Sequence, residues 1–372
     1  MDIFNNKSQV YEFSAPMPFD FDLIDELAQF NSTLKKSKIV TLFNNVPFCN
    51  DVDFNEWIQV LRGCSVEGIK TLKDFAKYVN YAQSRGFRFT YIMNSPKPMS
   101  TKDFYPFEER FDKLLNLLEN IGCSEIKFAN PQVAKLITEK KPDVFNFSSS
   151  TASEYHNISQ YEYLTTIFPN IKMFNVSNDE IFNFKFLKNL RTKFPDKKIE
   201  IMVNEPCLRG CPARISHISS IKFYNFNCSA LKRKLGILNA FFRSGFVYPW
   251  NLHYYSEMGI NNFKFSAHPY LRSHFKIDKL KNYLNCVEKG IENISLYHFF
   301  NDIFAAYYSL GERYMRTPKD IMLKDVLPYL PNMEYFVKNG DKCSYNCGVD
   351  CNYCQECAKK LEKYFMSQQN IF

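Results

Sequence analysis

Cysteine is the residue type in this chain whose number and spacing most clearly indicate chemistry. The sequence has twelve cysteines, of which three form one group and five form another within fifteen residues. The first group is Cys207, Cys211 and Cys228, the second is Cys343, Cys347, Cys351, Cys354 and Cys357, and Cys49, Cys64, Cys123 and Cys286 are isolated. The N-terminus has neither the basic nor the apolar region of an export signal, so we expect a cytoplasmic protein. In the cytoplasm, close cysteine groups indicate metal or redox chemistry rather than a disulfide framework.

The first group lies on a segment that reads N-E-P-C-L-R-G-C-P-A-R-I-S-H. Gly210 lets the chain bend back between Cys207 and Cys211, and the neighbouring arginines would stabilise thiolates on that turn. Three cysteines supply three of the four ligands that a tetrahedral zinc site or a 4Fe-4S cluster needs. The fourth position either stays open for chemistry or is filled by Cys49, His217 or a cysteine of the second group.

The second group has three, three, two and two residues between successive cysteines. Five thiolates at this spacing could complete one tetrahedral site with one cysteine to spare, or lend a ligand to the first group. A zinc site that fastens the C-terminus is the alternative explanation. The spacing therefore predicts a second metal or cluster here, and it leaves zinc and iron–sulfur open.

The positive charge of the chain is concentrated around the first cysteine group. Residues 184–243 contain thirteen Lys and Arg against three Asp and Glu, so their net charge of +10 exceeds the +8 of the whole chain. A solvated lysine-rich face is one explanation, and a surface for RNA or an anionic small substrate is the other. Aromatic residues in the segment could stack on bases, although core packing explains such residues more often. They are Phe223, Tyr224, Phe226, Phe241 and Phe242.

Composition and periodicity predict the elements that must position these groups. With 45% hydrophobic and 17% aromatic residues among 372, the chain has a globular composition. No apolar run reaches the roughly 18 residues of a membrane helix. Short apolar runs alternate with helical patterns, two of which, 71–85 and 107–121, stop at glycines. The predicted strands are 38–43, 87–93, 125–128, 143–147, 171–174, 198–203 and 262–265, with an eighth at 221–226 or 245–248.

Eight strands alternating with helices predict an α/β fold, a closed (β/α)8-type barrel. A doubly wound open sheet is less favoured, because no glycine-rich phosphate turn follows a strand. After residue 295 helical patterns continue without strands, so we predict a barrel domain at 1–295 and a helical, cysteine-rich extension at 296–372. Barrel chemistry occurs at the C-terminal ends of strands. No catalytic residue can be named, and the polar residues that could bind substrate there are Asn204, Glu205, Arg214, His217 and Lys264.

Several segments of the chain resemble the collagenase-like peptidase family U32. They read K-P-D-V-F-N-F-S-S-S-T, P-N-I-K-M-F-N-V-S-N-D-E-I, K-I-E-I-M-V-N-E-P-C-L-R-G-C-P-A-R-I-S-H and Y-P-W-N-L-H-Y-Y-S-E-M-G-I-N-N-F-K-F-S. The resemblance covers about residues 38 to 275, and the cysteine-rich tail is similar to that of some members. It implies a barrel-like fold with an iron–sulfur cluster. Some relatives hydroxylate a quinone precursor or an RNA base without oxygen, and others are called peptidases or collagenases.

The resemblance also assigns residues. Cys207, Cys211 and Cys228 match the family's cluster cysteines, and Cys49 occupies a place like the N-terminal ligand of some relatives. Two departures stand out: K-F-S-A-H from Lys264 replaces the Lys-x-x-Gly-Arg of many members, and the further cysteine that many members carry after Cys228 is missing before that strand. If that Gly-Arg binds a substrate anion in relatives, this chain binds something else or binds it differently.

Three hypotheses follow from the sequence. The first is an iron–sulfur enzyme that modifies a small molecule or an RNA base. The second is a U32-type peptidase; the zinc-protease motif H-E-x-x-H does not occur, but a cysteine nucleophile such as Cys49 with a distant histidine is compatible with the sequence. The third is a non-catalytic RNA-binding protein whose two cysteine groups are structural metal sites.

Overall fold

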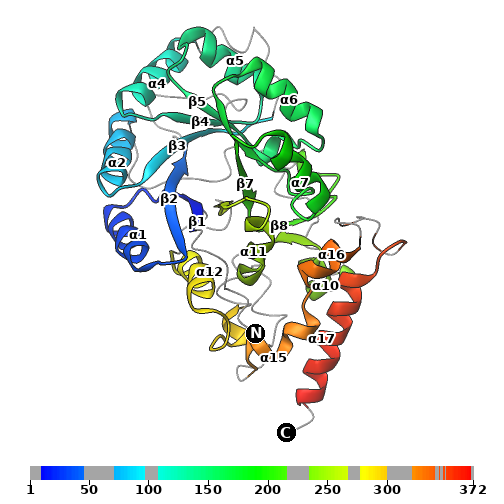
Figure 1. Ribbon diagram of the computed structural model, residues 1–372. Coiled ribbons are helices and arrows are strands. Elements are labelled where there is room, and N and C mark those ends of the chain that lie inside the picture. The colour runs from blue at the N-terminus through cyan, green and yellow to red at the C-terminus, as the bar shows by residue number, and fades with distance from the viewer. Residues whose placement is uncertain are drawn as a thin grey trace.

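The computed structural model describes residues 10–45, 71–96, 108–215, 234–266, 277–299, 321–339, 343, 347 and 349–369. Eight parallel strands of these residues close into a barrel in the order β1-β10-β7-β6-β5-β4-β3-β2 (Figure 1). The strands are β1 (Tyr11–Pro16), β2 (Ser37–Asn44), β3 (Arg88–Met93), β4 (Glu125–Phe128), β5 (Asn146–Ser149), β6 (Ile171–Asn175), β7 (Lys198–Met202) and β10 (Asn262–Lys264). The predicted (β/α)8-type α/β barrel is confirmed.

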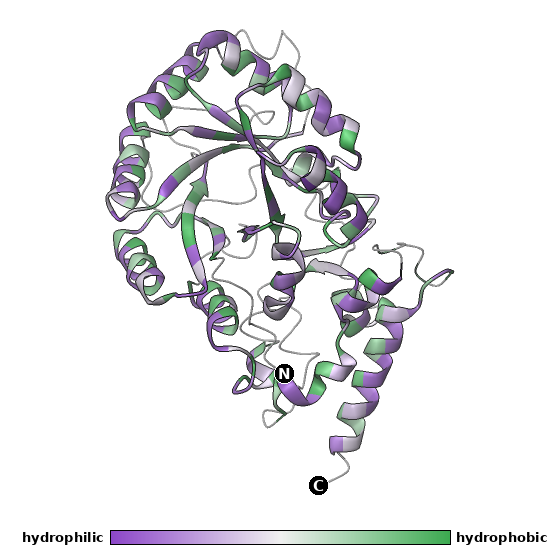
Figure 2. Cartoon of the chain, in the orientation of Figure 1, coloured by the Kyte–Doolittle hydropathy of each residue, from purple (hydrophilic) through white to green (hydrophobic). Residues whose placement is uncertain are grey.

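Amphipathic helices surround this barrel, with hydrophobic and hydrophilic residues mixed along each of them (Figures 1 and 2). They are α1 (Phe21–Thr33), α2 (Leu72–Ser84), α4 (Glu108–Asn120), α5 (Pro131–Lys140), α6 (Ile158–Ile167), α7 (Phe184–Lys193) and α12 (Ile277–Lys289). Thr71 caps α2 by accepting a hydrogen bond from the Asp74 N–H. Gly86 and Gly122 follow α2 and α4 with φ of 87° and 67°, which confirms both predicted glycine stops.

The eighth barrel strand is not where the sequence analysis placed it. β1 pairs with both β2 and β10 and so closes the barrel. The segment 245–248 was wrong as a barrel strand, because β9 (Ser244–Phe246) pairs antiparallel with β8 (Asn204–Leu208) in a separate two-stranded sheet. The other alternative, 221–226, lies outside the described residues. β1 gives a weak signal because its sequence, Y-E-F-S-A-P, is short and ends in proline.

The interior of the barrel is polar. Successive residues of a strand point to opposite faces, so in each barrel strand every second side chain points inward. The inward-facing buried polar residues are Ser14, Thr41, Thr90, Lys127, Ser148, Asn175, Glu200 and Lys264. Branched apolar side chains usually fill such a barrel. An interior with this many hydrogen-bonding groups is therefore suited to holding polar or charged groups of a ligand.

The C-terminal part ends in one long helix that packs beside the two-stranded sheet (Figure 1). Its helices are α13 (Leu296–His298), α15 (Leu323–Val326), α16 (Met333–Lys338) and α17 (Tyr353–Gln369). α17 packs against α10 (Ile237–Phe242), which leads directly into β9. Ala358 and Leu361 of α17 are buried. The C-terminal cysteines are thereby held next to the sheet that carries Cys207, and the domain division between 295 and 296 stays a prediction.

Candidate functional site

An ion pair with extra hydrogen-bonding partners lies inside the barrel. Lys127 Nζ donates to Glu200 Oε2 at 2.5 Å, and Ser14 Oγ donates to Glu200 Oε1 at 2.6 Å. Because β4 and β7 are not neighbours in the sheet, the contact between Lys127 and Glu200 crosses the interior. Lys127 also donates to Asn175 Oδ1 at 3.0 Å. The buried amide nitrogen of Asn175 has no hydrogen-bond partner within the described parts of the chain.

Lys264, at the C-terminal end of β10, is a second amine in the same interior. Its Nζ lies 4.2 Å from the centroid of the Phe43 ring. Burial, and after it the positive charge of Lys127, lowers the pKa of the Lys264 amine well below its ordinary value, while Glu200 opposes this change. Burial acts to raise the pKa of the Glu200 carboxyl, but Lys127 and Lys264 outweigh it, and that pKa is lowered. Lys127 and Glu200 thus form an ion pair, and Lys264 beside them is an amine that releases its proton more readily than an ordinary lysine.

Lys264 was predicted from the sequence, whereas Lys127, Glu200, Ser14 and Asn175 were not. A signal was present in the segments E-I-K-F and K-I-E-I-M, where charged residues alternate with apolar ones in two predicted strands. Helices cover the outer side of a parallel barrel, so charged residues beyond the first turn of such a strand are expected to point inward. That reasoning places charges in the interior, although it does not identify which of them pair.

The first cysteine group lies on β8 and on the turn that follows it. Gly210 makes this turn with a φ of 68°, as the sequence predicted. Cys207 and Cys211 have intermediate exposure and form no disulfide with another described cysteine. Cys228 and the two further candidate ligands, Cys49 and His217, lie outside the described residues. The cluster predicted on Cys207, Cys211, Cys228 and Cys49 therefore stays a prediction.

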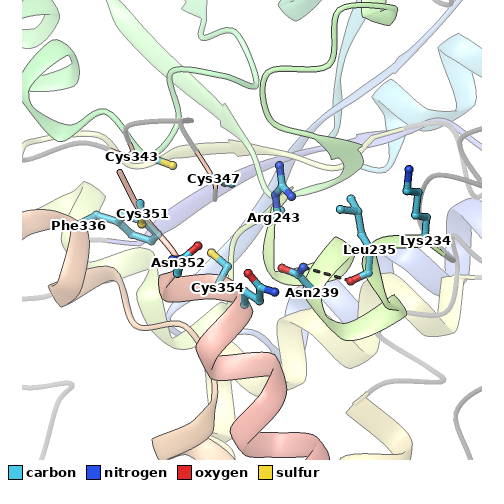
Figure 3. Close-up of a pocket in the computed structure, with 11 residues that line it drawn as sticks. Lys234, Leu235, Asn239, Arg243, Phe336, Cys343, Cys347, Cys351, Asn352 and Cys354 are labelled. Carbon is cyan, nitrogen blue, oxygen red and sulfur yellow. Dashed lines mark hydrogen bonds between the residues drawn. The ribbon is translucent and has the colours of Figure 1, made fainter. Parts of the chain in front are cut away.

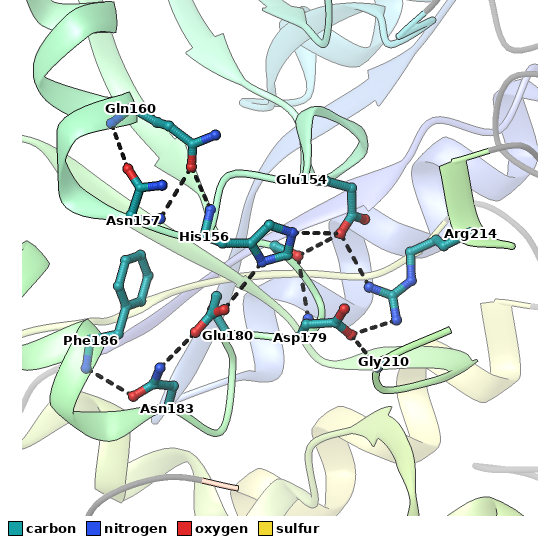
Figure 4. A network of polar contacts seen from close by, with 11 residues as sticks. Glu154, His156, Asn157, Gln160, Asp179, Glu180, Asn183, Phe186, Gly210 and Arg214 are labelled. Carbon is teal, nitrogen blue, oxygen red and sulfur yellow. Dashed lines mark hydrogen bonds and ion pairs between the residues drawn. The ribbon is translucent and has the colours of Figure 1, made fainter. Parts of the chain in front are cut away.

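Arg214 fastens this cysteine turn to the barrel (Figure 4). Its guanidinium is 2.7 Å from Asp179 Oδ1 and 3.3 Å from Glu154 Oε2. Asp179 also accepts a hydrogen bond from the Gly210 N–H at 2.8 Å, and Arg214 donates to the Leu208 carbonyl at 2.7 Å. Burial acts to lower the pKa of Arg214, but the two carboxylates raise it. The charge of Arg214 is paired with those of Asp179 and Glu154. Its role in substrate binding stays a prediction.

His156 belongs to the same polar network and was also missed (Figure 4). Its Nδ1 is 3.2 Å from Glu180 Oε1, and its Nε2 is 3.6 Å from Glu154 Oε2. The hydrogen bond with Glu180 raises the pKa of His156 above its ordinary value, against the effect of burial. Burial raises the pKa of Glu154. These residues follow β5 and β6, and no spacing in the sequence connects His156 with its two carboxylates.

Four of the five C-terminal cysteines line one pocket (Figure 3). The walls of this cavity of about 270 Å³ include Cys343, Cys347, Cys351, Cys354, Lys234, Arg243 and Phe336. The Cys354 thiol donates to the Phe242 carbonyl at 3.3 Å, and Arg209 Nη2 donates to the Cys354 sulfur at 3.7 Å. Because Arg209 is only two residues beyond Cys207, this thiol pocket adjoins the first cysteine group.

The thiol pocket fits a four-thiolate metal centre in the number and kind of its donors. Cys357, the fifth cysteine, is buried in α17 and does not line the pocket. Burial raises the pKa of the Cys354 thiol to about 12, against the effect of Arg209. Within the described part of the chain, no three His, Cys, Asp or Glu side chains are gathered closely enough, as they stand, to hold a metal ion. A metal would therefore have to draw the four thiols together and displace their protons.

Two further substrate-binding candidates make structural contacts near the strand ends. Asn204 Oδ1 accepts the Ser266 N–H at 2.5 Å, and Glu205 Oε1 accepts the Cys207 N–H at 3.1 Å. These bonds fix the backbone at the ends of β7 and β10 and at the start of the cysteine turn. Their predicted contact with substrate stays a prediction.

Part of the basic segment 184–243 is internal. Arg209 and Arg214 are buried, as are Phe241 and Phe242, so core packing accounts for those two aromatic residues. Phe223, Tyr224 and Phe226 lie outside the described residues. RNA binding by this segment stays a prediction. None of the helices in the described ranges is long and apolar enough to cross a membrane.

Comparison with known proteins gives one relative over nearly the whole chain. No family model matches the sequence. The chain is 24% identical to an uncharacterized protease of Methanocaldococcus jannaschii, over 94% of this chain and 99% of that protein. Among solved structures, a U32 peptidase aligns with a TM-score of 0.45 and 9% identity, over 70% of this chain and 94% of that one. N-acetylneuraminate lyase from Fusobacterium nucleatum aligns with a TM-score of 0.39 and 12% identity, over 96% and 98%. Over nearly its full length, the chain is thus similar to an archaeal protein that is described as an uncharacterized protease.

Proposed function

We propose that the chain is an iron–sulfur enzyme that modifies a small polar molecule by the oxygen-independent chemistry that its family resemblance implies. The observation that carries this proposal is the thiol pocket, where four cysteines lie beside the Cys207 turn. The polar barrel interior supports a small polar substrate, because it offers buried amide, hydroxyl and charged groups. An RNA base is the alternative substrate, and the basic segment is its support.

In this proposal Cys343, Cys347, Cys351 and Cys354 hold one centre. Lys234 and Arg243, on the wall of the same pocket, offset the negative charge of the thiolates. The predicted cluster on Cys207, Cys211 and Cys228 would be a second centre a short distance away. A bound iron–sulfur cluster would supply or accept electrons for the reaction. Zinc is the alternative metal at the C-terminal cysteines, where it would serve a structural role.

Metal and sulfide analysis of anaerobically purified protein tests this assignment. We expect iron, acid-labile sulfide and the visible absorption of an iron–sulfur cluster. Cys351→Ser and Cys354→Ser should each lose iron from the C-terminal centre, and Cys207→Ser should lose it from the second. Cys286→Ser is the matched control, because Cys286 is a buried cysteine of α12 that belongs to neither group. A colourless protein with stoichiometric zinc would contradict the proposal.

A peptidase is the second candidate, and the similarity to the archaeal protease favours it. A peptidase with a cysteine or other protein nucleophile does not need the thiol pocket to be loaded. Hydrolysis of unfolded proteins or collagen-like peptides is therefore measured with the purified chain and with Cys207→Ala and Cys351→Ala. Cleavage that persists in both variants supports the peptidase and argues against the iron–sulfur enzyme.

A further inference from the structure

The cluster inside the barrel contains an amine, Lys264, to which neither proposed function assigns a chemical step. We propose that Lys264 is a nucleophile that forms a Schiff base with the carbonyl carbon of a small aldehyde or ketone. The proposal goes beyond both candidate functions, because it concerns neither cysteine group and requires no metal. It rests on the contacts of the interior cluster and on the place of Lys264 in the barrel.

Two amines of the interior cluster share the carboxylate of Glu200. Both oxygens of Glu200 are engaged, Oε2 by Lys127 and Oε1 by Ser14. Lys264 instead faces the ring of Phe43 at 4.2 Å. An ammonium that is shielded from water and has no carboxylate of its own is costly, whereas a neutral amine is not. Lys127, Glu200 and Lys264 together are electrically neutral when Lys264 has lost its proton, and Glu125, at the start of β4, is a further carboxylate that acts on Lys264.

The charges around Lys264 act on its pKa in opposite directions. Burial and Lys127 lower its pKa, whereas Glu200 and Glu125 act in the opposite direction. Glu125 accepts hydrogen bonds from Thr90 at 3.1 Å and from Ser148 at 3.2 Å. Desolvation together with a neighbouring cation is one of the established ways in which proteins turn lysine into a nucleophile at neutral pH. Here Lys127, which forms the ion pair with Glu200, is that cation.

Lys264 also lies at the end of the barrel where a substrate would enter. Lys264 is the last residue of β10, at the end of the barrel where enzymes of this fold carry their chemistry. The unpaired amide nitrogen of Asn175 lies in the same polar interior, because Asn175 pairs in register with Glu200. This group is a buried donor without an acceptor, and an oxygen of a bound carbonyl compound could accept from it.

The proposed step balances without an oxidant or a further reactant. The Lys264 Nζ lone pair attacks the carbonyl carbon and a C–N bond forms. The two hydrogens of the amine leave with the carbonyl oxygen as water, and a C=N bond remains. When this imine takes up a proton, Glu200 is the nearby carboxylate that stabilises the positive charge.

Reductive trapping with glyoxylate and cyanoborohydride at pH 7 tests the proposal, with the modified lysines located by mass spectrometry. Lys135, an exposed lysine of α5, is the reference for this measurement. A lysine side chain in water is neutral in only about one molecule in 2,500 at pH 7. We expect carboxymethylation of Lys264 to be at least roughly tenfold faster than that of Lys135. Lys264 labelling no faster than that of Lys135, or labelling of Lys127 in its place, overturns the proposal.

A pair of variants separates nucleophilicity from packing. In Lys127→Met, Lys264 is the amine of the cluster that remains to pair with Glu200. The Lys264 amine should therefore keep its proton. Its labelling at pH 7 should fall at least about tenfold and recover as the pH is raised towards 10, whereas Lys127→Arg should label like the unchanged protein. A purely structural effect lowers labelling equally at all pH values. That result, or unchanged labelling in Lys127→Met, contradicts the assigned role of Lys127. Whether Lys264 is the nucleophile is decided separately, by which lysine is labelled in the unchanged protein.

Discussion

Lys127 and Glu200 are two charged side chains almost wholly shielded from water, with 2% and 1% of their surfaces exposed. Removing each charge from water costs several kcal/mol, and their attraction and added hydrogen bonds must offset this cost. Ser14 and Asn175 provide those hydrogen bonds. The pair is therefore stable only as a complete set, and loss of one member leaves a buried charge without compensation.

Glu200→Gln should lower the free energy of unfolding by about 3–5 kcal/mol, because Lys127 would lose its carboxylate in the interior. Urea denaturation followed by circular dichroism measures this change. Glu119→Gln is the matched control, since the pair of Glu119 with Lys141 at 2.7 Å lies on the surface. The control should lose no more than about 1 kcal/mol. Similar losses of unfolding free energy in the two variants would show that the interior pair contributes no more to stability than the surface pair.

His156 should give the protein a pH-dependent stability. Folding raises the pKa of His156 above its value in the unfolded chain, which is about 6.5. The contribution of His156 is therefore complete below about pH 6.5 and disappears as the pH rises through the folded-state pKa. The difference in unfolding free energy between the unchanged protein and His156→Gln should shrink between pH 6 and 9 in a series of urea titrations. A difference that grows with pH in this range would contradict the assignment.

Among the elements, the ribbon of β8 and β9 decides where the cysteine turn lies. Asn178 donates to the Cys207 carbonyl at 3.4 Å, and its side chain lies directly over Gly245 of β9. A Cβ atom at position 245 would overlap the amide of Asn178. Glycine is thus required here for space, and the contact joins the ribbon to the segment that follows β6.

Gly245→Ala should destabilise the protein by about 1–3 kcal/mol, since Asn178 must move away. It should also speed the alkylation of Cys207 by iodoacetamide, measured by peptide mass spectrometry. Asn178→Ala in the same chain should restore much of the lost stability, because it removes the overlap. Effects of the two substitutions that simply add would contradict the proposed contact.

At the scale of the whole molecule, the C-terminal helix joins the tail to the barrel side. Leu361 of α17 is fully buried, and α17 packs against α10. The sequence predicts that 296–372 is an extension and not an independent domain. This prediction has a thermodynamic meaning, because an extension unfolds together with the structure that it covers.

Leu361→Ala should lower the free energy of unfolding by about 2–5 kcal/mol, since it creates a cavity under α17. Unfolding followed by tryptophan fluorescence and by far-ultraviolet circular dichroism should give coincident curves. Val349→Ala is the control, because Val349 is 84% exposed and its truncation should change little. Two separate transitions would contradict the prediction of a single folding unit.

The sequence predicted the strands and helices of this molecule better than the side-chain contacts inside its barrel. The strand 125–128 and the helix before Gly86 were correct because apolar periodicity and glycine stops are local signals. The cysteine groups were visible in the sequence because their members lie close together along the chain. The Lys127–Glu200 pair and the network of His156 depend on residues that the fold brings together, and a linear pattern does not contain that information. β1 was missed for a different reason, because it is short and ends in proline.

The ion pair that crosses the barrel also bears on the order in which the chain folds. Lys127 and Glu200 are 73 residues apart in sequence, and Ser14 and Glu200 are 186 apart. A half-barrel that has formed β1 to β4 holds Lys127 without its carboxylate, and so gains little from shielding that strand from water. Contacts of such long range also slow folding. We therefore expect partial barrels to be poorly populated, so that closure of the ring and pairing of its interior charges occur together.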